Sequence, residues 1–402
     1  MTSTTELDPR MVAVLAVTCG VAVGNIYFPQ AITPLVAAGL RTSPDAAAMA
    51  VSATQIGYAG GIFLLVPLGD RLAHRRLLLT LLGLAGLGLL AAGCAPTLPL
   101  LVAASGLVGL TTVGAQVIGP LVTGMVDAER RGAVLGTLLS GSVGGMILAR
   151  TFSGVLGEWL GWRAPYLVAA ALVFILVAVL ARMLPVTTSL SRESYPALLA
   201  ESMRLLRLEP QLRRSCFYQA SVFAGFSAVW TALAVLLTDP AYGLTTSAVG
   251  LFALVGGVTM LCTPIAGRWV DRRGPDPVNL VCILGVLVSA AVLAGGAHGG
   301  ALGLVALVVG TLLLDVAMQS GMVANQARVY ALRPEQRSRL NTAYMTCAYL
   351  GGSAGSWLGL RIYGALGWPG VCALVAVLAT LALVKHYRKA DRRNRDSRFV
   401  SV

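Results

Sequence analysis

An acidic side chain, Asp315, lies in the middle of a long apolar stretch of the sequence. The fourteen residues before it are apolar apart from glycine and one threonine, and apolar residues also follow it. A charge at the centre of a bilayer costs roughly 2.5–3.5 kcal/mol on insertion scales. A carboxylate at this position therefore indicates a role that offsets this cost. At 100° per residue, Gln319, Met322 and Gln326 fall within about 40° of Asp315 on a helix. We expect this polar stripe to face a wet cavity.

Two interpretations of Asp315 stay open from the residues alone. As a proton carrier, a carboxylate beside a cavity takes up and releases protons. As a structural group, it stays ionised and pairs with an arginine. Replacement by asparagine separates the two, because asparagine cannot take up and release a proton.

The other intramembrane ion is Arg150, which we place in the outer half of its span. It can pair with Asp315, bind an anionic group, seal an outer gate or serve helix packing by extending its charged end toward the interface. Its expected depth argues against a direct pair with Asp315.

The composition is that of an integral membrane protein. Of the 402 residues, 56% are hydrophobic and only 12% are charged, and the mean hydropathy is +0.78. Soluble domains carry about 25% charged residues. The seven cysteines all lie in apolar runs, which predicts buried packing residues rather than disulfides or metal ligands. We therefore expect an all-α membrane protein without a bound metal.

Twelve apolar runs are long enough to cross a membrane as helices, because a span needs about 20 residues. They cover residues 11–37, 46–68, 77–95, 98–126, 132–156, 164–184, 215–238, 246–268, 277–297, 301–327, 338–363 and 367–385. A polar linker, 185–214, divides them into an N-terminal six-helix half, 1–184, and a C-terminal six-helix half, 215–385. A basic tail, 386–402, follows, and we expect it to be disordered.

The linker itself predicts a short helix on the membrane surface, with an apolar face made of Leu198, Leu199, Met203 and Leu206. Most of the 30 Lys and Arg residues fall in loops on one side of the predicted membrane. The positive-inside rule makes that side cytoplasmic, so both termini are predicted to be cytoplasmic. The net charge of +13 follows from this topology, and we do not expect a nucleic-acid partner.

The two halves repeat one another. The segment RGAVLGTLLSGSVGGMILARTFSGVLGEWLGW, 131–162, is similar to RSRLNTAYMTCAYLGGSAGSWLGLRIYGALGW, 337–368. Both begin with an arginine, carry a GG pair near the middle and end in GW. A duplicated six-span unit is typical of transporters that bind substrate between the halves.

A shorter repeat, PLGDRLAHRR at 67–76 and PIAGRWVDRRG at 264–274, carries a resemblance to a known family. It resembles the loop motif G-x-x-x-D-R-x-G-[RK]-[RK] of the major facilitator superfamily. Asp70, Arg71, Arg75 and Arg76 fit the first copy, in which Val66 and Ala73 replace glycines, and Gly267, Asp271, Arg272 and Gly274 fit the second. The resemblance covers the whole chain and implies the twelve-helix fold with two pseudo-symmetric halves.

The loop motif has a physical interpretation of its own. A carboxylate at a helix end can cap a neighbouring helix and pair with arginines. We interpret Asp70 and the basic residues around it as a cytoplasmic latch between the halves. The alternative is a charge cluster that only sets topology.

Further segments resemble the twelve-span drug:proton antiporter branch of the superfamily: NIYFPQ at 25–30, TQIGYAGGIFLLVPLGDR at 54–71, and NQARVYALRPEQRSRLN at 325–341. The arginine usual in span 4 of that branch is absent here. In the family, spans 1, 4, 7 and 10 line the cavity, and the chain is a monomer. The resemblance therefore implies substrate contacts from Asn25, Tyr27, Gln30, Gln116, Tyr218, Gln219 and Trp230, beside Gln319, Met322 and Gln326.

Several chemistries have no matching residues in the sequence. No G-x-x-x-x-G-K-[ST] phosphate loop and no H-E-x-x-H pair occurs. The sequence predicts a secondary transporter, not an enzyme, that uses a proton gradient rather than a cofactor. We expect efflux of small amphipathic compounds. A dedicated metabolite exporter, an uptake symporter, and a non-transporting receptor or intramembrane enzyme remain the alternatives.

Overall fold

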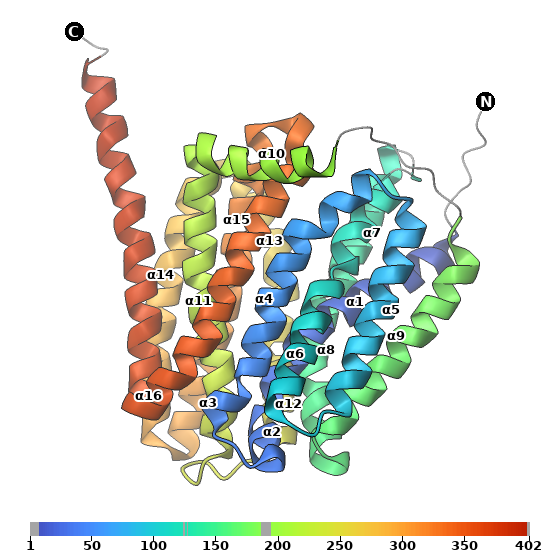
Figure 1. Ribbon diagram of the computed structural model, residues 1–402. Helices are drawn as coiled ribbons and strands as arrows, with labels where there is room; N and C mark the ends of the chain where they lie inside the picture. Colours follow the sequence, from blue (N-terminus) through green and yellow to red (C-terminus); the bar gives the residue numbers. More distant parts are fainter. Residues whose placement is uncertain (1–7, 124, 127, 186–193, 400–402) are drawn as a thin grey trace.

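The computed structural model is a bundle of long helices that run between two ends (Figure 1). The structure describes residues 8–123, 125–126, 128–185 and 194–399. Both termini and the crossing helix α10 lie at one end, called here the termini end, and α2, α3 and α12 lie at the opposite, distal end. The N-terminal half contains α1 (Pro9–Ala31), α2 (Thr33–Leu40), α3 (Pro44–Ala47), α4 (Met49–Leu64), η1 (Val66–Asp70), α5 (His74–Gly93), α6 (Leu98–Thr111), α7 (Gly114–Thr123), α8 (Ala128–Leu160) and α9 (Arg163–Met183).

After α10 (Tyr195–Leu208), the C-terminal half follows the same plan. It contains α11 (Pro210–Thr238), α12 (Thr246–Ala253), η2 (Leu254–Val258), α13 (Thr259–Arg273), α14 (Pro275–Ala294), η3 (Gly295–His298), α15 (Gly300–Leu332), η4 (Pro334–Gln336) and α16 (Arg337–Phe399).

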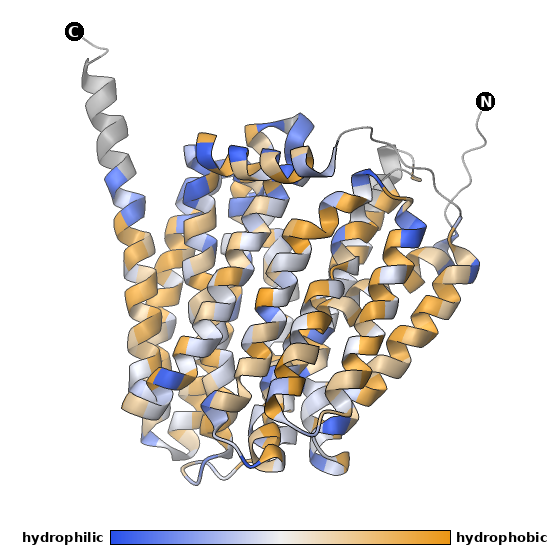
Figure 2. Ribbon diagram, viewed as in Figure 1, coloured by the Kyte–Doolittle hydropathy of each residue, from blue (hydrophilic) through white to orange (hydrophobic). Residues whose placement is uncertain are grey.

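The helices confirm the predicted all-α membrane fold. Among the described residues, 11 helical stretches are long and apolar enough to cross a membrane. One of them, Arg337–Arg388, contains two of the predicted spans. The second begins at Gly367, which adopts φ 66° and turns the chain there. Large apolar side chains such as Leu139, Trp159 and Leu302 are exposed, and apolar residues cover the sides of the helices in Figure 2. An exposed apolar surface of this extent suits lipid rather than water.

Several predicted spans are interrupted, among them the first, the fourth and the eighth. In the first predicted span, α1 ends at Ala31 and the chain resumes a helix as α2. The helix is broken because Pro34 has no N–H to continue the helical hydrogen bonds. The fourth span breaks at Thr112 and Val113, between α6 and α7. The eighth span is divided into α12, the 3₁₀ turn η2 and α13.

The linker and the tail can be compared only where the structure describes them. A helix, α10, does lie in the linker, with Leu198 and Leu205 buried, and Figure 1 shows it across the termini end. Linker residues 186–193 lie outside the described residues. The expected disorder of the tail is wrong for its backbone up to Phe399, because α16 continues through it as a helix.

Glycines allow one pair of helices in each half to pack closely. In the N-terminal half, a methyl group on Gly145 of α8 would lie 2.1 Å from the carbonyl oxygen of Gly20 on α1. In the C-terminal half, a methyl group on Gly355 of α16 would lie 2.0 Å from the carbonyl oxygen of Ala224 on α11. Gly141 and Gly145 of α8 thus face α1 within one half.

This packing predicts a large difference between two neighbouring glycines. Gly145→Ala is expected to destabilise the protein by about 1–3 kcal/mol, because the backbone of α1 must move to admit the methyl group. Gly144→Ala should have almost no effect, since a methyl group there meets nothing within 4 Å. Thermal unfolding of the purified variants measures both. Equal melting temperatures for the two variants would contradict the packing.

Candidate substrate and coupling site

The two intramembrane charges meet at one tryptophan. Trp230 of α11 donates its indole N–H to Asp315 Oδ1 on α15 at 3.0 Å. The guanidinium carbon of Arg150 on α8 lies 4.2 Å from the centroid of the Trp230 ring. All three side chains are buried, with 2–4% of their surface exposed. Trp230 therefore joins an acid of the C-terminal half to a base of the N-terminal half.

Arg150 is held by further groups around it. Its Nε and Nη2 both donate to Gln30 Oε1 of α1, at 3.0 and 2.8 Å. The rings of Tyr27 and Phe226 lie 5.1 and 5.4 Å from its guanidinium carbon. Desolvated cation–π contacts are worth about 2 kcal/mol each, which offsets part of the cost of burying this charge. A direct ion pair with Asp315 was not expected, and none of 4.0 Å or less joins the two groups among the described residues.

A second group of aromatic residues joins the halves beside Arg150. The hydroxyl of Tyr27 lies 3.3 Å from that of Tyr349 on α16, and the ring of Tyr349 packs edge-on against Tyr58 of α4 and Phe223 of α11. Gln116 of α7 donates to the hydroxyl of Tyr58 at 3.3 Å. The sequence analysis missed Tyr58 and Tyr349. The sequence feature that could have identified them is a tyrosine, a ring with a polar hydroxyl, inside an apolar span.

Four other predicted residues lie at helix contacts around this centre. Asn25 donates to Thr112 at 3.2 Å, where the fourth span breaks. Gln319 of α15 reaches the sulfur of Met146 on α8 at 3.9 Å and so crosses between the halves. Gln219 accepts from Tyr344 at 3.0 Å. Gln326 approaches the sulfur of Met345 at 4.0 Å.

The predicted stripe on α15 is only partly buried. Asp315 and Gln319 are buried, whereas Met322 and Gln326 are half-buried. The stripe therefore runs from the buried charges toward the termini end of α15.

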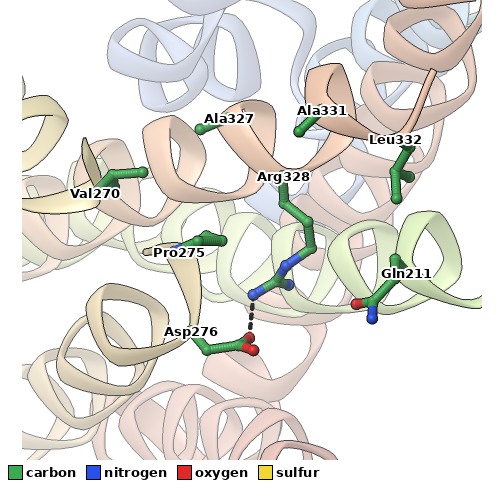
Figure 3. Close-up of a pocket in the computed structure, with 8 residues that line it drawn as sticks. All are labelled: Gln211, Val270, Pro275, Asp276, Ala327, Arg328, Ala331 and Leu332. Atoms are coloured by element: carbon green, nitrogen blue, oxygen red, sulfur yellow. Dashed lines mark hydrogen bonds and ion pairs between the residues drawn. The ribbon is translucent and has the colours of Figure 1, made fainter. Parts of the chain in front are cut away.

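Tyr218 lies apart from this centre, in a charged cluster at the termini end. Arg214 Nε donates to the Tyr218 hydroxyl at 2.7 Å. Arg214 Nη2 also lies 2.9 Å from Asp276 Oδ1, and Arg328 forms a second ion pair with the same carboxylate. Arg328 and Asp276, joined by their ion pair in Figure 3, line a cavity of about 600 Å³ together with Gln211. These ion pairs join α11, α14 and α15 within the C-terminal half.

The sequence analysis missed this cluster because the loop motif ends at Gly274. Gly274 adopts φ 78° between α13 and α14, so Asp276 falls in the first turn of α14. Asp271 and Arg272 of the motif are exposed, and Gly267 has no atom near its missing methyl position. Of these two acids, Asp276 forms ion pairs with arginines, and none is found for Asp271 among the described residues.

The first copy of the motif, 67–76, begins within η1 at the termini end. Asp70 is the last residue of η1, and Arg71 and Arg76 are exposed. Arg75 donates to the carbonyl oxygen of Ala181 on α9, in the same half. The latch between the halves stays a prediction.

Polar contacts between the halves concentrate toward the distal end. Ser353 of α16 donates to the carbonyl oxygen of Ser52 on α4 at 3.0 Å, and Ser356 donates to Gln55 at 3.1 Å. Thr151 of α8 donates to the carbonyl oxygen of Gly250 on α12 at 2.7 Å. The structure therefore holds the two halves together on the distal side.

The side chains of this site can exchange protons and bind a ligand. Among the described residues, no group of three or more His, Cys, Asp or Glu side chains could hold a metal ion. One buried acid, one buried base and several aromatic rings and amides converge between the halves. Such groups suit a ligand with apolar and polar parts.

Comparisons with known proteins agree with this architecture. Residues 13–311 and 216–399 match the sequence model of the Major Facilitator Superfamily. The Uncharacterized transporter YgaY of Escherichia coli O157:H7 is 32% identical over 387 residues, which cover 96% of this chain and 97% of that protein. A Chloramphenicol resistance protein of Streptomyces lividans is 27% identical over 271 residues, covering 66% of this chain and 68% of that protein.

The fold also matches a solved structure. A crystal structure of the nucleoside transporter NupG superposes with a TM-score of 0.78 at 14% identity, over 94% of this chain and 98% of that one. At this identity the likeness describes the fold alone.

Proposed function

The chain belongs to the major facilitator superfamily, and we propose that it is a proton-coupled exporter of small amphipathic compounds that works by alternating access. One observation carries the proposal. The buried carboxylate of Asp315 and the buried guanidinium of Arg150 come from opposite halves and share Trp230. Any step that changes the charge of Asp315 therefore changes the attraction between the halves.

The proposed coupling follows from that attraction. While Asp315 is ionised, it accepts the indole N–H of Trp230 and attracts Arg150, which favours the arrangement closed at the distal end. Protonation removes this attraction and favours opening on the distal side. A ligand or proton shifts such an equilibrium only by its different affinity for the two arrangements. Exchange of a proton for substrate at this centre makes transport depend on the gradient.

The side chains around the two charges support small ligands with apolar and polar parts. Rings of Tyr27, Phe226 and Trp230 surround the charges, and the amide of Gln30 lies beside them. One acid and one base give no strong preference for net charge. The name of the Streptomyces lividans relative, a Chloramphenicol resistance protein, supports export of compounds of this class.

We place the protein in the bacterial plasma membrane as a monomer with both termini cytoplasmic. The termini end then corresponds to the cytoplasmic side, because most Lys and Arg residues lie in the segments that reach it. The partners of the proposed function are the small-molecule substrate, protons and lipid. Neither a cofactor nor a nucleic acid has a part in it.

Everted membrane vesicles test the proposal directly. Vesicles that contain the protein are energised, and a panel of unrelated amphipathic dyes and antibiotics, chloramphenicol included, is added while the internal pH is followed. We expect gradient-dependent uptake of several compounds and a proton flux that each of them triggers. Uptake that survives collapse of the proton gradient would contradict proton coupling. Failure to move any compound would replace broad efflux by one dedicated substrate.

A further inference from the structure

The distal part of the eighth span lies against the opposite half of the protein. α12 (Thr246–Ala253) belongs by sequence to the C-terminal half, yet it packs along α8 of the N-terminal half. The 3₁₀ turn η2 separates it from α13, which packs on α14 and α15 of its own half. A single span is thus shared between the two halves, and η2 is the point of division.

One stripe of α8 holds α12 in place. Thr151 donates to the carbonyl oxygen of Gly250, and the carboxylate of Glu158 accepts the backbone N–H of Ser247 at 2.8 Å. Between them, a methyl group on Gly154 would lie 2.4 Å from the carbonyl oxygen of Thr246. The three α8 residues are spaced by three and four positions and so share one face. We call this contact between α8 and α12 the distal clasp.

The turn that joins α12 to α13 also touches the buried acid. A methyl group on Gly256, in the middle of η2, would lie 2.8 Å from Asp315 Oδ2. The other carboxylate oxygen accepts the Trp230 N–H. The carboxylate therefore lies between α11 and η2. Any side chain at position 256 would press against this carboxylate, and glycine avoids the contact.

We propose that Gly256 is a positioning residue that seats the Asp315 carboxylate, and that η2 transmits the charge state of Asp315 to the distal clasp. The inference rests on the proposed function, in which Asp315 takes up and releases the proton. The charged or titratable groups that face Asp315 are Arg150 from α8 and Tyr27 from α1. An ionised carboxylate is held by Trp230 and Arg150 and keeps η2 beside it. A neutral one is held less firmly and lets η2 and α12 move.

Two adjacent glycines give a matched test. Gly256→Ala places a methyl group against the carboxylate, whereas a methyl group on Gly257 meets nothing within 4 Å. Neither glycine has a positive φ, so alanine fits the backbone at both positions. Amide hydrogen exchange of the full-length protein in nanodiscs, read by mass spectrometry over residues 243–258, reports opening of the clasp. We expect exchange at least about fivefold faster in Gly256→Ala and changed by less than about twofold in Gly257→Ala.

A mutant cycle with Asp315→Ala identifies the contact. Without the carboxylate, the added methyl group has nothing to displace, so Gly256→Ala should change exchange by less than about twofold in that background. If Gly256→Ala does not fold, Asp315→Asn provides the same readout, because a neutral side chain should also speed exchange in α12. Equal exchange in the two glycine variants, or the same effect of Gly256→Ala with and without Asp315, overturns the inference.

The exchange experiment needs neither substrate nor a proton gradient, so it is independent of the transport assay. Faster exchange in Gly256→Ala, together with transport that does not depend on the proton gradient, would support the positioning role of Gly256 and reject proton coupling. The opposite pair of results would retain proton coupling and reject the positioning role.

Discussion

Asp315→Asn is expected to reduce gradient-driven transport to the level of vesicles that lack the protein. Asparagine has nearly the size of aspartate, and its carbonyl oxygen can still accept the Trp230 N–H that now binds Asp315 Oδ1. The substitution thus keeps the shape of the site and removes the group that binds and releases the proton. Uptake into energised everted vesicles measures the loss.

A second readout of the same variant separates a carrier from a structural group. Exchange of internal for external substrate needs no net proton movement, so a carrier variant should retain it while net transport is lost. Loss of both, with a lower melting temperature, would indicate that Asp315 mainly stabilises the fold. Asp45→Asn is the matched control, because Asp45 is an exposed acid in α3 at the distal end. Asp315→Asn with full gradient-driven transport would reject the carrier role.

The spans and the two intramembrane charges could be predicted from the sequence for simple physical reasons. Each span needs about 20 apolar residues, and the chain carries few charges that interrupt them. Asp315 and Arg150 stand out because any charge inside such a run is costly. Gln319 could be placed beside Asp315 because helical periodicity fixes which side chains share a face.

The contacts of these residues were harder to predict, because depth along a helix depends on packing with its neighbours. Tyr218 was expected in the cavity with Gln219, but α11 begins at Pro210, five residues before the predicted span. Tyr218 therefore reaches the cluster of Arg214 and Asp276 near the termini end. Neighbouring residues on a helix point 100° apart, so one can line a site while the next does not.

The interruption of the eighth span could not be predicted from the sequence either. The apolar run across residues 246–268 shows no proline until Pro264, and its glycine pair is common in membrane helices. What marks Gly256 is the carboxylate of Asp315, which is 59 positions away in the chain and adjacent only in the folded protein. Likewise, Arg150 was expected nearer the outer face, but the large ring of Trp230 connects it to Asp315.

Arg150 is expected to be as sensitive as Asp315, although for a different reason. Arg150→Met keeps an unbranched apolar side chain but leaves Gln30 Oε1 without its two donors and Asp315 without the neighbouring positive charge. Removing one member of a buried charged network typically costs about 3–5 kcal/mol. We expect a lower melting temperature and loss of transport. Arg361→Met is the matched control, because Arg361 also lies over a tryptophan, Trp357, but at an exposed position.

Two further variants show whether charge or shape makes Arg150 necessary. Arg150→Lys keeps the charge, but a single ammonium cannot donate twice to Gln30 and also lie flat on Trp230, so transport should fall about tenfold. In Arg150→Met with Asp315→Asn, both charges are gone, so the melting temperature should rise above that of Arg150→Met alone. Transport should stay lost, because the double variant has no group that carries the proton. If the double variant is no more stable than Arg150→Met, the two charges do not interact across Trp230, and the proposed link between the halves fails with them.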